Sequence, residues 1–168
     1  MEKLTLRPAI DEDATFVFEM MQNKDFQKHY LERLIFKSVE DAKNEIIKFA
    51  REAKRKNAFY FIVMLGKEKI GILDIYKISK NDKKASIGYG ILRGHWGKGY
   101  GKQICKMGIE YANNKLKLHS MEATADPKNK ASQRVLEKNG FIKLCTAKDY
   151  YFDRGQFVDR DLYWKILK

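Results

Sequence analysis

Residues 87–112 read IGYGILRGHWGKGYGKQICKMGIEYA and hold the most informative local pattern in this chain. A run of branched and aromatic residues, typical of a strand, leads into a turn with glycines at 97, 99 and 101, and apolar residues then recur at helical spacing. Glycine permits positive φ and brings bare backbone N–H groups close to a ligand, while the start of the following helix adds a positive dipole end. The pattern therefore predicts a pyrophosphate site between a strand and a helix.

Two common phosphate-binding motifs do not fit this turn. A P-loop requires Gly-Lys followed by Ser or Thr, whereas Lys98 is followed by Gly99. A Rossmann fingerprint requires G-x-G-x-x-G within a βαβ unit, whereas this turn has G-x-G-x-G and the strands before it are predicted hairpins. The sequence therefore disfavours both nucleotide hydrolysis by a P-loop and dinucleotide binding of the Rossmann type.

The rest of the chain predicts strands and helices that alternate in a mixed order. Apolar residues at helical spacing indicate a helix through 16–21 and another after Ser38, where Asp41 resembles the partner in a capping box. Short breaks between the apolar runs of 58–92 indicate antiparallel hairpins. The other predicted segments are a short first strand through Leu4 and Leu6 ahead of Arg7-Pro8, a strand at 119–125, a helix at about 129–138 that stops at Gly140, and two strands within 141–167 folded about 153–155. The predicted order is β-α-α-β-β-β-α-β-α-β-β, an α/β fold in which helices pack on a mixed sheet.

Composition restricts the class of protein. The 168 residues, 44% of them hydrophobic, predict a single domain over 1–168, and no apolar run approaches the roughly 18 residues of a membrane-spanning helix. A net charge of +12 favours an anionic partner, which could be nucleic acid, an anionic membrane or a phosphate-bearing small molecule. Acidic residues near the N-terminus argue against a signal peptide and predict a cytoplasmic protein. Cys105 and Cys145 are expected to be reduced thiols, and no spacing indicates a metal site.

Two stretches together resemble a known family. Residues 87–112, and residues 119–141, which read HSMEATADPKNKASQRVLEKNGF, resemble the acetyl-CoA-binding core of the GNAT N-acetyltransferase superfamily. The nearest branch is the one typified by acetyltransferases of ribosomal-protein N-termini and of spermidine. The resemblance implies the GNAT fold, a central mixed, mostly antiparallel twisted sheet flanked by helices. It also implies acetyl-CoA as cosubstrate, no metal, and transfer of the acetyl group by direct attack of a primary amine in a ternary complex.

The resemblance also implies where acetyl-CoA binds. The pyrophosphate would lie on the glycine turn, and the splayed strand that ends at Ile91 and Leu92 would pair with the pantetheine arm. One of these two N–H groups would then be available to the thioester carbonyl, where negative charge develops. Asn129 and Ser132 match a signature of the following helix and would line the thiol end. The implied cofactor-binding residues are Ile91, Leu92, Trp96, Gly97, Lys98, Gly99, Tyr100, Gly101, Lys102, Asn129 and Ser132.

Three positions depart from the family pattern, and two of them leave the catalytic residues less defined. The third is Trp96, where the family often has Arg or Gln, and cofactor binding is expected to survive this change because backbone groups do most of the work. Leu136 stands where the family often has a tyrosine that protonates the leaving thiolate, and Ser86 stands where it often has a glutamate. Glu122 is our first candidate for the base, and an edge carboxylate paired with a lysine is the structural alternative. Ser132 would either protonate the thiolate or cap its helix. The other candidates are Asp74 for the base and Tyr89, Tyr100, Tyr150 and Tyr151 for the acid.

Several alternatives stay open at this point. The +12 charge also fits a ribosome- or nucleic-acid-associated module, although no aromatic RNA-binding motif is present, so nucleic acid is the less favoured partner. An acyl-CoA sensor without turnover is a third reading. The acceptor would be a small-molecule amine or a protein N-terminus, with specificity expected within 16–36 and no membrane partner. The oligomeric state is open, and a homodimer is among the alternatives.

Overall fold

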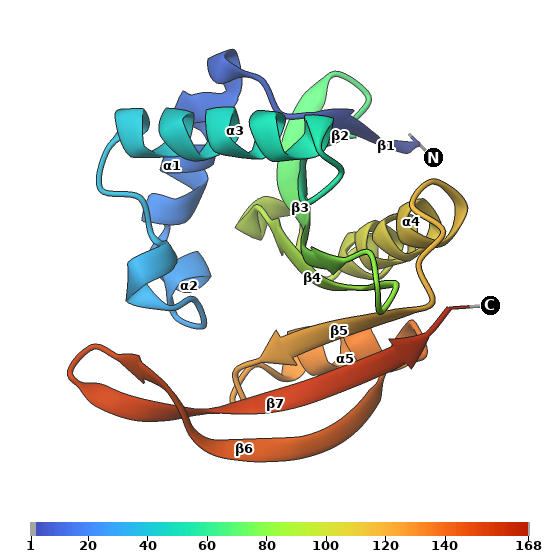
Figure 1. Ribbon diagram of the computed structural model, residues 1–168. Helices are drawn as coiled ribbons and strands as arrows, with labels where there is room; N and C mark the ends of the chain where they lie inside the picture. The colour runs from blue at the N-terminus through green and yellow to red at the C-terminus, as the bar shows by residue number, and fades with distance from the viewer. Residues whose placement is uncertain (1–2, 168) are drawn as a thin grey trace.

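The computed structural model describes residues 3–167 as a seven-stranded sheet with helices on both faces (Figure 1). The strands lie in the order β1-β2-β3-β4-β5-β7-β6, and neighbouring strands are antiparallel except β4 and β5, which are parallel. The strands are β1 (Leu4–Pro8), β2 (Phe59–Leu65), β3 (Glu68–Ser79), β4 (Lys84–Ile91), β5 (Ser120–Ala125), β6 (Ile142–Asp153) and β7 (Gln156–Ile166). The helices are α1 (Ala14–Gln22), α2 (Lys24–Gln27), α3 (Val39–Lys54), α4 (Tyr100–Asn114) and α5 (Lys130–Lys138).

This arrangement confirms the predicted fold class and element order. The sequence did not predict α2 or the short 3₁₀ turns η1 (Asp11–Asp13), η2 (Glu32–Leu34) and η3 (Arg93–His95). These elements are three or four residues long, which is too short for a hydrophobic period to appear.

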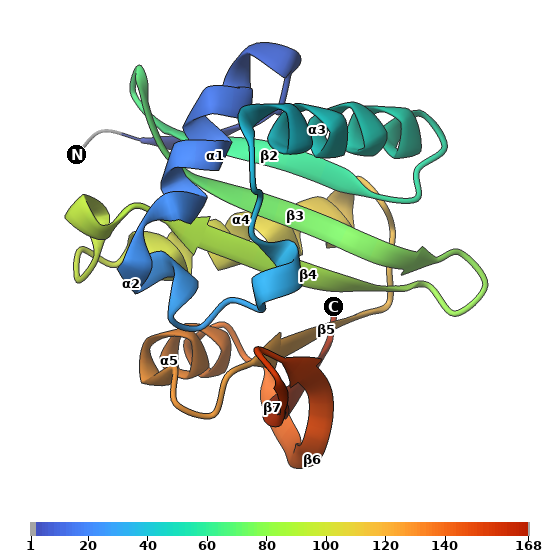
Figure 2. The ribbon, with the colours of Figure 1, turned by 90° about the vertical axis from the view of Figure 1, so that its left-hand side faces the viewer.

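Side chains that alternate along the strands build a core on each face of the sheet. Figure 2 shows α1, α2 and α3 in front of the sheet and α4 behind it. Ile72 of β3 is buried with residues of α1 and α3, such as Val17 and Ile46. Its neighbour Leu73 points to the other face and is buried with Ile104 of α4. Strands buried on both faces explain why the apolar runs of 58–92 are nearly continuous in the sequence.

The neighbours β4 and β5 pair over only part of their length. Their register covers Lys84–Ser120, Ala85–Met121 and Ser86–Glu122, and no pairing follows these three. β4 nevertheless remains paired with β3 as far as Ile91. The two parallel strands therefore diverge after Ser86, which confirms the splay that the family resemblance implied.

A buried carboxylate joins β1, η1 and β3. Asp13 is 1% exposed and accepts hydrogen bonds from both terminal nitrogens of Arg7 at 2.8 Å and from the backbone N–H of Ile10 at 2.9 Å. Lys69 Nζ lies 2.7 Å from the same carboxylate. Burial alone would raise the pKa of Asp13, but these donors outweigh it and lower the pKa to about 2. The charged group thus fixes the entry to α1 against the sheet.

The start of α3 has one of the two hydrogen bonds that define the predicted capping box. Ser38 Oγ accepts the backbone N–H of Asp41 at 3.0 Å, as expected for an N-cap. The carboxylate of Asp41, however, accepts the N–H of Lys37 at 3.1 Å, one residue before the position that a capping box would use.

Candidate active site

The glycine turn between β4 and α4 has the backbone shape that its sequence predicted. Gly97 and Gly99 adopt φ of 75° and 80°, in the left-handed region, and a Cβ at either position would meet open space. Gly99 is the N-cap of α4 and supplies no side-chain hydrogen bond, so no side chain caps the first N–H groups of this helix. The turn therefore presents bare backbone donors at the positive end of a helix of 15 residues.

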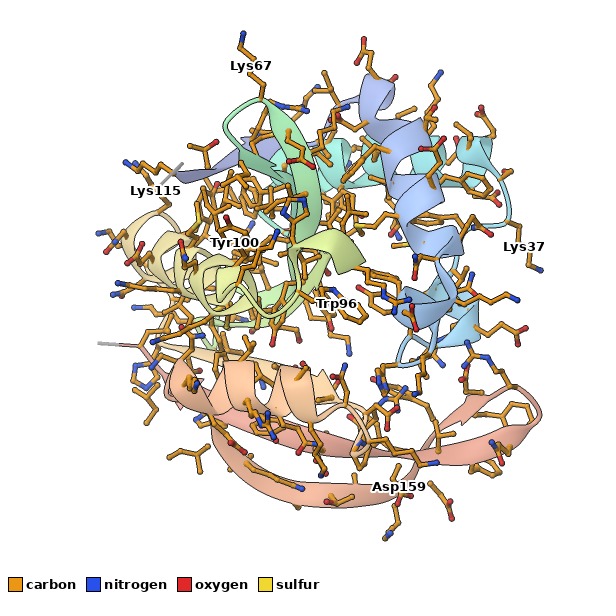
Figure 3. All side chains as sticks on the ribbon, turned by 180° about the vertical axis from the view of Figure 1, so that it is seen from behind. Lys37, Lys67, Trp96, Tyr100, Lys115 and Asp159 are labelled. Carbon is orange, nitrogen blue, oxygen red and sulfur yellow. The ribbon has the colours of Figure 1, made fainter. Side chains whose placement is uncertain are left out.

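Trp96 ties this turn to the end of β4. Its indole Nε1 donates to the backbone C=O of Ile91 at 2.9 Å, while the ring is 46% exposed. Trp96 and Tyr100, the first residue of α4, flank the turn and are labelled in Figure 3. Trp96 stands where a charged or amide residue is common in the family, and here it positions the backbone.

Hydrogen-bond alternation along β4 identifies the backbone groups that face the gap beside β5. The N–H of Leu92 donates to the C=O of Ile70 in the β3 direction at 2.8 Å, and its C=O accepts the N–H of His95 at 2.9 Å. Since successive residues of a strand point their N–H and C=O groups to opposite sides, Ile91 and Tyr89 face the gap. Of the two N–H groups that the sequence left open, that of Leu92 is therefore already bonded to β3, and the N–H of Ile91 is the group at the open edge.

The start of α5 carries the predicted Asn129 and Ser132, in roles that the structure separates. Asn129 Oδ1 accepts the N–H of Ser132 at 3.0 Å and caps the helix. The Ser132 hydroxyl is therefore not the cap, which removes that alternative, and its Oγ lies 3.2 Å from the hydroxyl of Tyr89. Burial raises the pKa of Tyr89, so this phenol stays protonated at neutral pH. Tyr89 thus supplies a hydroxyl beside Ser132 from β4, whereas Leu136 of α5 is buried in the core.

A cavity of about 670 Å³ lies between the α1–α3 layer and the diverging strands. Asp74 of β3, Tyr89 of β4 and Ser132 of α5 all contribute to its wall. Within residues 3–167, the Asp74 carboxylate has no hydrogen-bond donor other than its own backbone. Loss of solvent around the carboxylate, reinforced by the negative charge of Glu45, raises the pKa of Asp74 to about 7. A Cβ at Gly88 would lie 2.4 Å from Asp74 Oδ1, so a side chain at that position would displace the carboxylate from its present place.

Glu122 occupies a neighbouring but different environment. It lines a smaller cavity of about 110 Å³, together with Tyr76 and Tyr150, and does not line the larger one. Ser86 Oγ donates to Glu122 Oε1 at 2.8 Å, so the partner of this carboxylate is a serine rather than the lysine of our structural alternative. Glu122 and Asp74 nevertheless project from the same face of the sheet, because Ser86 pairs with Glu122 and Gly88 with Asp74.

Contacts between residues far apart in sequence hold the outer wall of the larger cavity. His29 Nδ1 lies 2.8 Å from Asp126 Oδ2, 97 residues later. Arg154, in the turn between β6 and β7, donates to the C=O of Tyr30 at 3.2 Å, and the N–H of Glu32 donates to Asp153 at 2.7 Å. No local pattern indicates these pairs, so sequence reasoning missed them.

The thiols and the remaining charged residues indicate no second chemistry. Cys105 is buried, and desolvation raises its pKa to about 12, whereas Cys145 is exposed. Across residues 3–167, no group of His, Cys, Asp and Glu could hold a metal ion. In the same range no helix has the length and apolar character needed to cross a membrane.

Comparisons with known proteins agree with this geometry. Residues 3–142 match the family model described as an acetyltransferase (GNAT) domain. The chain is 30% identical over 160 residues to the uncharacterized N-acetyltransferase p20 of Bacillus licheniformis, covering 94% of this chain and 89% of that protein. Among solved structures, RimL, a ribosomal L7/L12 α-N-protein acetyltransferase in complex with coenzyme A, has a TM-score of 0.89 at 19% identity, covering 98% and 94% of the two chains. The spermidine N-acetyltransferase from Vibrio cholerae in complex with CoA and spermine has a TM-score of 0.86 at 19% identity, covering 98% and 95%.

Proposed function

Because this chain belongs to the GNAT acetyltransferase family and is an acetyl-CoA-dependent N-acetyltransferase, we propose that it acetylates a primary amine bound in the cavity around Asp74. Family membership decides against the two non-enzymatic readings, the nucleic-acid module and the acyl-CoA sensor. The observation that carries the proposal is a half-buried carboxylate, without a side-chain donor among residues 3–167, in a cavity that also reaches Ser132 and the gap beside β4. The donor side and the acceptor side of the reaction would then meet in one cavity.

The donor side is supported by backbone geometry. We propose that residues 96–102 hold the pyrophosphate through the bare N–H groups of the turn and of the start of α4. The N–H of Ile91, at the open edge of β4, would pair with the pantetheine arm or the acyl carbonyl. Acetyl-CoA supplies an activated acetyl thioester for transfer. Asn129 and Ser132, at the start of α5, would border its thiol end.

The acceptor side requires a group that removes a proton, since an ammonium ion cannot attack a thioester. We propose Asp74 for this role because it lies in the larger cavity and its pKa of about 7 leaves a large ionised fraction at neutral pH. Glu122, our first candidate from the sequence, is the alternative base, oriented by the Ser86 hydroxyl. Ser132 would donate a proton to the departing thiolate and recover one from Tyr89, whose hydroxyl is within reach.

Carboxamide variants distinguish the two bases. Asp74→Asn should lower kcat/KM for the amine by about 100-fold or more, the usual contribution of a positioned base, while the KM for acetyl-CoA stays unchanged. Glu122→Gln is the matched control, a carboxylate on the same sheet face in the smaller cavity, and should lower kcat/KM by less than about tenfold. Thiol release from acetyl-CoA measures both. The reverse ranking would transfer the role to Glu122, and wild-type levels in both variants would exclude a carboxylate base.

Three broader predictions also remain proposals. We propose one domain over residues 1–168, supported by a single sheet that includes β1 near one end of the chain and β7 near the other. We propose a cytoplasmic location, supported by the similarity to a putative ribosomal N-acetyltransferase. A homodimer is open to test by solution scattering or sedimentation.

A further inference from the structure

Among residues 3–167, the carboxylates that line the larger cavity are already paired, with one exception. Glu45 contacts Lys48 Nζ at 3.0 and 3.1 Å. Glu52 accepts the side-chain amide of Asn57 at 2.9 Å and lies 3.5 Å from Arg55. These two glutamates and their partners stand on α3 and just after it, on the side of the cavity away from Ser132.

Asp126, another carboxylate of the cavity, also has partners already. Asp126 binds His29 at 2.8 Å and accepts the backbone N–H of Lys128 at 2.8 Å. Within residues 3–167, Asp74 is the one carboxylate of this cavity that has no side-chain donor recorded. A ligand with one positive charge would find one free carboxylate, whereas a second positive charge would have to displace an existing partner.

The walls around Asp74 are aromatic and apolar. Phe36, Phe49 and Met21 line the cavity, and Ile72 lies two residues before Asp74 on the same strand face. Tyr60, 9% exposed, has a buried hydroxyl without a hydrogen-bond partner. Tyr60 of β2 stands opposite Asp74 of β3 in the antiparallel register, so the two side chains are neighbours on one face of the sheet. Burial, and next the charge of Asp74, raise the pKa of the Tyr60 hydroxyl. An unpaired phenol and an unpaired carboxylate in apolar surroundings point to a ligand that has one polar end.

Three cations on the wall of the cavity add no attraction for a polycation. Arg33 stacks 4.5 Å from the centre of the Tyr151 ring, and Arg160 lies 5.8 Å from the same centre. Lys77 also lines the cavity. These positive groups share the cavity wall with Asp74, so they would repel the further charges of a polyamine.

We propose, on the basis of the acetyltransferase function argued above, that the acceptor is a primary monoamine with an apolar body. Its ammonium would bind Asp74 and the Tyr60 hydroxyl, and its body would pack on Phe36, Phe49 and Met21. A polyamine would leave its further charges unpaired, and a protein N-terminus would bury peptide groups against apolar walls; both are disfavoured by desolvation.

Competing amines test the proposal directly. The probes are 2-phenylethylamine, spermidine and a short peptide with N-terminal alanine, each assayed with the full chain and acetyl-CoA by thiol release. We expect kcat/KM for 2-phenylethylamine to exceed that for the other two by at least about tenfold. Equal or faster turnover of spermidine or of the peptide would overturn the monoamine assignment and leave the transferase function intact. Absence of thiol release with all three would overturn both.

A variant tests the reason for this selectivity. Lys48→Met should free Glu45 and so raise the spermidine to 2-phenylethylamine ratio of kcat/KM by at least about threefold. Arg55→Met is the matched control, because it removes a more distant partner of Glu52, which keeps its amide donor from Asn57. An unchanged ratio in Lys48→Met, with the variant folded by circular dichroism, would show that pairing of Glu45 does not set the selectivity and would overturn the argument.

Discussion

Replacing Gly99 by alanine isolates the contribution of backbone conformation to coenzyme binding. Gly99 has φ of 80° and a Cβ there would meet nothing within 4 Å, so the substitution introduces strain without a clash. An L-residue in the left-handed region costs roughly 1–2 kcal/mol. If the turn keeps its shape, the free energy of unfolding falls by about that amount; if the turn relaxes, affinity for acetyl-CoA falls instead by roughly 5–30-fold. The sum of the two losses should be about 1–2 kcal/mol.

Two other glycines provide controls in the same chain. Gly94 also faces open space but has no positive φ, so Gly94→Ala should change neither stability nor affinity. Gly155 has φ of 79° and open space, but it lies in the β6–β7 turn. Gly155→Ala should therefore lower stability by about 1–2 kcal/mol without affecting acetyl-CoA binding.

Urea unfolding and calorimetric titration with acetyl-CoA measure the two losses separately. If Gly99→Ala changes neither the free energy of unfolding nor the affinity for acetyl-CoA, the argument that positive φ shapes the turn is refuted. A loss of affinity equally large in Gly94→Ala would show that the effect comes from added bulk.

The remaining predictions concern four other features. Asp13→Asn should lower the free energy of unfolding by about 2 kcal/mol at neutral pH, and because the folded pKa lies below 3.8, this difference should fade as pH falls toward about 2. The effect of Asp74 on stability has the opposite dependence on pH. Its pKa of about 7 in the folded state lies above 3.8, so the free energy of unfolding falls as pH rises from 3.8 through 7. Asp74→Asn should therefore unfold at a higher urea concentration than the wild type at about pH 8, although activity is lost. In the wild type, kcat/KM should rise with pH through about 7, and this rise should be absent in Asp74→Asn. Tyr89→Phe should reduce kcat by about tenfold with little change in the KM for acetyl-CoA. At about pH 8 iodoacetamide should label Cys145 and spare Cys105 in the folded protein, as peptide mass mapping would detect.

Elements with local signals could be predicted from the sequence. Ser38 marks the start of α3 through its side-chain oxygen, and Gly140, with φ of 78°, marks the end of α5. The glycine turn was predicted because its spacing, its strand and its helix all lie within one continuous stretch. In each case the physical cause lies within a few residues.

Parts of the site that depend on distant contacts could not be predicted. Alternation shows that Asp74 and Ile72 share a face of β3, but it does not show that the helices covering this face leave a cavity at Asp74. The contact between Tyr89 and Ser132 joins residues 43 positions apart. The choice between the N–H groups of Ile91 and Leu92 stayed open because it depends on the register with β3, which the sequence leaves undetermined.

In the proposed mechanism, adjacent residues of β4 would serve the two halves of the reaction. Gly88 leaves room for Asp74 on the acceptor side, and the next residue, Tyr89, reaches Ser132 on the thiol side. Inserting or deleting a single residue before this pair would invert the strand and exchange the two environments. Evolution of new acceptor preferences in this scaffold is therefore expected to proceed by changes in the helices and loops around the strand, and not by changes in its length.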